Sequence, residues 1–238
     1  MTGTVSRVAS RSINFSNSAP YFGGLLLLAL IAFWPTYVSR PFTADTHTHR
    51  HALTATLWML MLVAQPLAIR TKRLTLHRRL GRSSYALAPL VLMSMVLLAH
   101  SKTHGLSVAQ NVGIYVPLSL TALFALAYAL GILTRRTVAL HARFMVCTAL
   151  TLIDPVLVRM MFWVNPSPTW MYQWFTFAVT DLVFVVFIWR ERHARSGRAV
   201  FPTMLGVFGL AQAILLFGFY QGSWWQAFVR WFVALPLT

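Results

Sequence analysis

Two histidines stand in a repeated local pattern that suggests cofactor binding. A basic pair, a short spacer and Leu-His-x-Arg occur around His77 and again around His141. One neutral imidazole from each of two neighbouring helices is the usual ligand set of a b-type haem, and nearby arginines can neutralise the haem propionates. Arg79 and Arg143 each follow one of these histidines by two residues. The pattern therefore predicts a haem b held by His77 and His141, with Arg79 and Arg143 at its propionates.

Other histidines fall in two short stretches, one before His77 and one between His77 and His141, and a different chemistry is open to them. They are His47, His49, His51, His100 and His104. In an extended segment the side chains at 47, 49 and 51 point to one face. A zinc, copper or iron ion could use such a group. A second haem between His51 and His104 or His100 is an alternative, and a solvated polar loop is another.

Three charged residues lie inside apolar stretches, where a charge costs about 3 kcal/mol or more. They are Asp154, Asp181 and Arg159. Counted from the same end of their helices, both acids lie ~15 Å deep. Two carboxylates at one depth titrate as a coupled pair, which a proton relay needs, and Arg159 could serve as the counter-ion. A buried ion pair that fixes helix packing is the alternative.

The elements that must position these residues are membrane helices. Hydrophobic residues make up 58% of the 238 residues and charged residues only 10%, which does not fit a soluble surface. Apolar runs of ~20 residues suit a helix that crosses the hydrocarbon. Seven are present, at 21–39, 52–69, 83–100, 112–134, 144–164, 170–189 and 200–220. The sequence thus predicts an all-α, polytopic membrane protein with seven transmembrane helices.

Charge distribution predicts the orientation of these helices. The net charge of +16 comes mainly from residues before the first run and after runs two, four and six, which share one side: Arg7, Arg11, Arg70, Lys72, Arg73, Arg78, Arg79, Arg82, Arg135, Arg136, Arg143, Arg190, Arg192, Arg195 and Arg198. The positive-inside rule then places the N-terminus in the cytoplasm and the C-terminus outside. Basicity of this kind indicates a lipid partner, not nucleic acid. The expected location is the inner (cytoplasmic) membrane of a bacterium.

The predicted domain organisation has three parts. Residues 1–20 form a cytoplasmic tail, 21–220 the seven-helix membrane domain, and 221–238 an aromatic segment that lies in the outer interface. A third helix from Leu74 to His100 would measure about 40 Å at 1.5 Å per residue, so that one histidine stands at each membrane face. His77 and His141 would then share the inner face.

Two resemblances rest on these histidines. Single histidines on four consecutive helices at alternating faces resemble the ascorbate-reducible cytochrome b family and its bacterial di-haem relatives, over roughly residues 45–165. The motif His-Arg-Arg-Leu-Gly at 77–81, with His-Ala-Arg-Phe-Met at 141–145, is similar to uncharacterised bacterial multi-pass membrane families, and this match is closer. The first resemblance implies electron transfer across the bilayer with an electron donor or acceptor as partner; the second implies no settled function.

Three functions remain open on this reading. The first is a membrane oxidoreductase or electron-transfer protein of the histidine-ligated type. The second is a membrane metalloprotein or metalloenzyme with an outward-facing histidine site, in which Asp45 or Asp154 would act as base. The third is a small transporter or channel whose intramembrane polar groups line a path.

Overall fold

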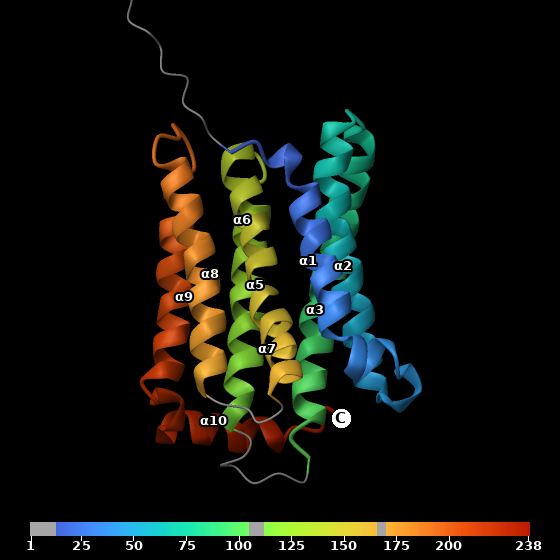
Figure 1. Ribbon diagram of the computed structural model, residues 1–238, viewed down its shortest axis with the longest axis vertical. Helices are drawn as coiled ribbons and strands as arrows, with labels where there is room; N and C mark the ends of the chain where they lie inside the picture. The colour runs from blue at the N-terminus through green and yellow to red at the C-terminus, as the bar shows by residue number, and fades with distance from the viewer. Residues whose placement is uncertain (1–12, 105–111, 166–169) are drawn as a thin grey trace, which may run out of the picture.

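A computed structural model describes residues 13–104, 112–165 and 170–238, and all regular secondary structure in them is helical (Figure 1). The α-helices are α1 (Ala19–Ala32), α2 (Thr46–Arg70), α3 (Leu74–Ser101), α5 (Tyr115–Leu133), α6 (Val138–Leu150), α7 (Ile153–Val164), α8 (Trp170–Glu191), α9 (Val200–Leu216) and α10 (Ser223–Val233). Short helical turns are η1 (Phe15–Asn17), η2 (Trp34–Val38), η3 (Pro41–Thr43), η4 (Val112–Ile114) and η5 (Phe219–Gln221). The predicted all-α class is confirmed, and α3 begins and ends within one residue of the predicted limits.

Among the described residues, six helical stretches are long and apolar enough to cross a membrane, which makes the chain a multi-pass membrane protein. They are Phe15–Ala32, Thr46–Arg70, Leu74–Ser101, Tyr115–Leu133, Val138–Val164 and Met171–Glu191. The seventh predicted run corresponds to α9, which is apolar but shorter, with 17 residues. Large apolar side chains such as Leu27, Leu67 and Leu182 are exposed on the outside of the bundle, as a surface that faces lipid requires.

The long helices run side by side, and α10 lies across one end of the bundle (Figure 1). The α2–α3, α5–α6 and α8–α9 connections gather at the opposite end, together with η1. Most of the arginines of the described residues lie in or beside these three connections, so we call this the basic end. Arg7 and Arg11, predicted to be on the same side, lie outside the described residues.

The fifth predicted span is broken into α6 and α7. Proline has no backbone N–H, so Pro155 leaves the carbonyl of Thr151 without its usual helical partner. The helix stops at Leu150 and resumes at Ile153. This break puts Asp154 in the first turn of α7 and buries it within the bundle.

Aromatic side chains fill the interior. Trp58 packs edge-on against Phe124, with ring centroids 4.9 Å apart, where α2, α3 and α5 meet. Phe184 packs against Phe208 at 5.0 Å in a second cluster formed by α5, α6, α8 and α9.

The C-terminal segment predicted to lie in the interface is the helix α10. The sequence predicts one aromatic face directed to the interface, but in the structure the aromatic residues of α10 lie on two sides of the helix. Trp225, Val229 and Phe232 are buried against the ends of neighbouring helices, whereas Trp224 and Trp231 are exposed. One side of the helix therefore covers the end of the bundle, and Trp224 and Trp231 are exposed on the other side.

Candidate cofactor site at the basic end

A partly open cavity of about 1330 Å³ lies at the basic end, between η1, α2, α3, the α5–α6 connection and α6. Most of its wall is apolar and includes Phe22, Trp58, Met61 and Leu62. Its polar lining consists mainly of Gln65, His77, Arg78, Arg82, Ser84, Arg135, His141, Arg143 and Arg195. An apolar chamber with a cationic rim suits a planar or elongated apolar ligand that carries acidic groups.

His141 lines this cavity with its ring orientation fixed. Its Nδ1 lies 2.7 Å from the carbonyl oxygen of Gly131. A carbonyl only accepts, so Nδ1 carries the hydrogen and donates it, and Nε2 keeps a lone pair. A hydrogen bond of this kind to a backbone carbonyl is what orients metal-ligating histidines in proteins. No protein group in the described residues bonds to Nε2.

His77 lines the same cavity from the first turn of α3. Its ring contacts the backbone of Gln65 and is close enough to His141 for the two imidazoles to repel when charged. The Nδ1 atom of His77 and the Oε1 atom of Gln65 are buried without a hydrogen-bond partner. Buried polar atoms are nearly always satisfied in proteins, so these two atoms are unusual features of the cavity wall.

The basic motif of α3 does not place all its arginines at the cavity. Arg78, Gly81 and Arg82 line it together with His77, whereas Arg79 is exposed and takes no part in the lining. Residues four and seven to eight positions apart share a helix face, and Ser84 and Tyr85 continue this face. Arg78 and Arg82 lie four residues apart and share a second face of α3, about 100–140° around the helix from His77, so the periodicity from His77 gave no sign of them. Arg135 at the rim was likewise missed.

Arg143 lines the cavity, but its charge is already paired. The guanidinium forms a two-pronged ion pair with the carboxylate of Glu191 and also donates to the Ala139 carbonyl at 2.5 Å. Both side chains are almost fully buried. Glu191 in turn accepts from the backbone N–H of Ile13 at 3.0 Å, and the Arg143 guanidinium lies 5.4 Å from the ring centroid of Phe15. Arg143 thus ties α6, α8 and the segment before α1 together.

Gly197 permits this arrangement. Its φ is +79°, a left-handed conformation that favours glycine. A Cβ atom here would lie 2.8 Å from Nη1 of Arg143 and 3.1 Å from the Ala139 carbonyl oxygen. The α8–α9 connection can therefore close over the buried guanidinium only because residue 197 has no side chain.

The histidines predicted for the outer side have separate partners. The stretch from Thr46 is helical, not extended, so residues two apart point about 200° apart around α2. His49 bonds through Nδ1 to the Tyr37 hydroxyl at 2.9 Å, and His51 to the Ser94 hydroxyl at 3.2 Å. His47 has a buried Nδ1 without a partner.

His100 and His104 do come together at the other end of α3. Both contact the hydroxyl of Thr238, at 2.6 and 2.9 Å, and their ring centroids are 5.3 Å apart. Across the residues described, no group of three or more His, Cys, Asp or Glu side chains is arranged to hold a metal ion.

The intramembrane acids lie apart from the cavity and from Arg159. Asp154 accepts hydrogen bonds from Gln173 at 2.6 Å and from Thr176, and Asp181 accepts from Gln212 at 2.9 Å. The Arg159 guanidinium lies over the ring of Phe33, 5.5 Å from its centroid. In the part of the chain that the structure describes, Arg159 forms no ion pair with either acid.

Comparison with known proteins finds no match: no family model, no curated protein and no solved structure is similar to this chain.

Proposed function

We propose that this chain is a seven-pass membrane electron-transfer protein that holds a b-type haem at its basic end through His77 and His141. One observation carries the proposal. Two imidazoles from different helices line a single cavity, and each has a ring nitrogen that no described protein group occupies. Bis-imidazole ligation needs this arrangement.

The residues around the histidines fit such a group in size and polarity. Ligand pockets for small molecules usually measure about 300–1,000 Å³, so a cavity of about 1330 Å³ has room for a macrocycle. Trp58, Met61 and Leu62 would cover its apolar faces. Arg78, Arg82 and Arg135 would pair with two propionates at the rim, which is a role that Arg143 cannot share while Glu191 neutralises it.

The chain's own contribution is positioning and exclusion of water. The Gly131 carbonyl fixes the ring of His141 through Nδ1 and leaves Nε2 as the nitrogen that would ligate the iron. His77 would supply the second imidazole from α3. A bound haem supplies a one-electron iron couple, whose potential depends on the apolar walls and the cationic rim.

The proposed topology follows from the segregated charge. The basic end faces the cytoplasm by the positive-inside rule, and α9 completes the seventh pass despite its length of ~26 Å, because it packs alongside α5, α6 and α8. A bacterial inner membrane is the proposed location, and the electron partner would approach the basic end.

The test is the visible absorption spectrum of the full-length protein, purified in detergent from cells supplied with a haem precursor. We expect a Soret band that His77→Ala and His141→Ala each abolish or shift. His193→Ala is the matched control, because His193 is an exposed histidine at the same end and does not line the cavity. Absence of a Soret band in the wild type, or a band unchanged in both cavity variants, would overturn the proposal.

A further inference from the structure

The four acidic residues of the chain differ in how their charge is balanced. Asp45 pairs with Lys102, and Glu191 pairs with Arg143. Asp154 is only 4% exposed and has no basic partner among the described residues. A buried carboxylate without a neutralising charge is energetically costly, so something must balance it.

The hydrogen bonds to Asp154 all reach one oxygen. Gln173 donates its amide to Oδ1 at 2.6 Å, and the Thr176 hydroxyl donates to the same atom. The second oxygen, Oδ2, accepts no hydrogen bond from any described residue. One carboxylate oxygen is therefore available to a ligand.

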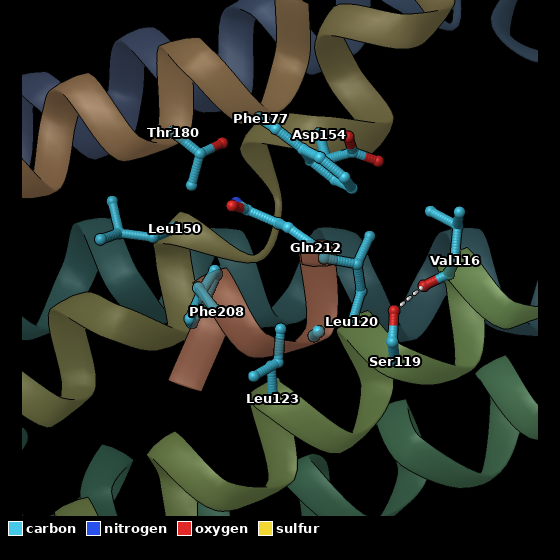
Figure 2. A pocket seen from close by; sticks show the side chains of 11 residues that line it. Val116, Ser119, Leu120, Leu123, Leu150, Asp154, Phe177, Thr180, Phe208 and Gln212 are labelled. Atoms are coloured by element: carbon cyan, nitrogen blue, oxygen red, sulfur yellow. Dashed lines mark hydrogen bonds between the residues drawn. The ribbon is translucent and has the colours of Figure 1, made fainter. Parts of the chain in front are cut away.

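Asp154 lines a small cavity between α5, α7, α8 and α9, shown in Figure 2. Its volume of about 20 Å³ has room for one water-sized particle, since about 10–15 Å³ is the minimum. The polar lining comes from Ser119, Thr180 and Gln212, and leucine and phenylalanine side chains make up most of the rest.

These polar side chains offer the cavity lone pairs. The Ser119 hydroxyl donates to the Val116 carbonyl at 2.9 Å, as the dashed line in Figure 2 marks, and the Thr180 hydroxyl donates to the Thr176 carbonyl at 2.9 Å. The Gln212 amide nitrogen donates to Asp181 at 2.9 Å, and its carbonyl oxygen accepts no hydrogen bond from a residue that the structure describes. Oxygen acceptors from four side chains thus line an otherwise apolar space of one-particle size, and oxygen is the ligand atom that a hard cation prefers.

We propose that this cavity is a binding site for one small monovalent cation, a proton or a sodium ion, which neutralises Asp154. The side chains that face the ion come from every surrounding helix: Ser119 of α5, Asp154 of α7, Thr180 of α8 and Gln212 of α9. Asp181 is the second charged group nearby and connects to the site through Gln212. The site lies apart from the haem cavity and does not depend on it.

Two measurements on the purified full-length protein separate the two ions. In the first, the melting temperature is followed as sodium chloride replaces choline chloride at constant ionic strength. In the second, infrared difference spectra in H₂O and D₂O report a protonated carboxylic acid. Both are made on wild type, on Asp154→Asn and on the exposed-acid control Asp45→Asn.

A bound sodium ion predicts stabilisation by sodium over choline that disappears in Asp154→Asn and persists in Asp45→Asn. A bound proton predicts a deuterium-sensitive carboxylic acid band that Asp154→Asn removes. Thr180→Val and Ser119→Ala leave the carboxyl in place and should weaken sodium binding about tenfold, so they serve if Asp154→Asn does not fold. The proposal is overturned if wild type shows neither sodium-specific stabilisation nor a carboxylic acid band, or if both signals survive in Asp154→Asn.

Discussion

Arg143 and Glu191 form a buried, two-pronged ion pair that joins the start of α6 to the end of α8 at the basic end of the bundle. Their 48-residue separation makes the pair a long-range contact. The carboxylate also holds the backbone of Ile13. The pair therefore fixes the position of the segment that forms one wall of the proposed haem cavity.

Removal of either partner should destabilise the protein strongly. Arg143→Ala or Glu191→Ala leaves an uncompensated buried charge, which typically costs about 3–5 kcal/mol. Replacement of both by leucine should cost less than either single change, because no charge is then stranded. Unfolding in detergent, followed by circular dichroism, measures these free energies. Lys102→Ala is the control, since it breaks an exposed pair worth under ~1 kcal/mol; equal losses in the two pairs would contradict the prediction.

The arginines of the α3 motif should differ in their effect on haem retention. Arg82→Gln removes a cation that lines the cavity, whereas Arg79→Gln changes an arginine three residues away that does not line it. A hydrogen bond to a charged group contributes ~1.5 kcal/mol or more, so Arg82→Gln should weaken haem binding roughly tenfold. Titration of each variant apoprotein with haem measures the two dissociation constants. Equal effects of the two substitutions would show that the rim does not hold the propionates.

Acid should remove the contribution of the Asp45–Lys102 contact. The Lys102 ammonium, 2.5 Å away, and the backbone N–H of Thr48 hold the pKa of the Asp45 carboxyl well below its usual range. A lowered folded-state pKa means that the contact stabilises the fold above the unfolded value of about 3.9 and loses this effect as pH falls below it.

The measurement is the melting temperature of wild type and Asp45→Asn from pH 7 to pH 3. Wild type should be the more stable at pH 7, by less than ~1 kcal/mol because the pair is exposed, and the difference should shrink below about pH 4. Asp45→Ala should lose a further ~1 kcal/mol at all pH values, since Asp45 also caps α2. A difference that grows toward low pH would have the wrong sign.

Close packing at Gly131 should control the orientation of His141. A Cβ at Gly131 would lie 3.0 Å from Sδ of Met145. Gly131→Ala should be tolerated because the methionine side chain is flexible. Gly131→Leu should push α5 from α6 and cost about 1–3 kcal/mol, and it should also disturb the Gly131–His141 bond. Met145→Ala added to Gly131→Leu should restore both stability and the haem spectrum. If neither is restored, the contact with Met145 is not the cause of the loss.

Much of the fold could be predicted because apolar length is a strong local signal. The helix from Leu74 to His100 and the proline break before α7 depend on residues close to them in sequence. Other features depend on contacts between distant residues. The burial of Trp225 and Phe232 of α10 depends on the ends of α3, α5 and α9, which are distant in sequence. Helical winding at His47, His49 and His51, in contrast, begins at the local cap Asp45 and could have been predicted.

The sequence indicated the two histidines that line the cavity but not the residues beside them, and haem binding by these histidines stays a prediction. The repeat around His77 and His141 placed both in one cavity. The sequence analysis assigned Arg143 to the haem propionates. Its partner Glu191 ends α8 among several arginines, and nothing in the sequence indicates that it pairs with Arg143. Arg79 was inferred from its distance to His77 along the chain, but Arg78 and Arg82, on another face of α3, are the arginines of this motif that line the cavity. Asp154 and Asp181 were paired by depth, yet amide and hydroxyl side chains from α8 and α9 bind them separately.

The positive φ at Gly197 makes the α8–α9 connection part of the protein's interior architecture. Surface loops usually accept inserted peptides, so this turn would look like a convenient place for an epitope tag. An insertion there would open the lid above the Arg143 guanidinium and admit water to it.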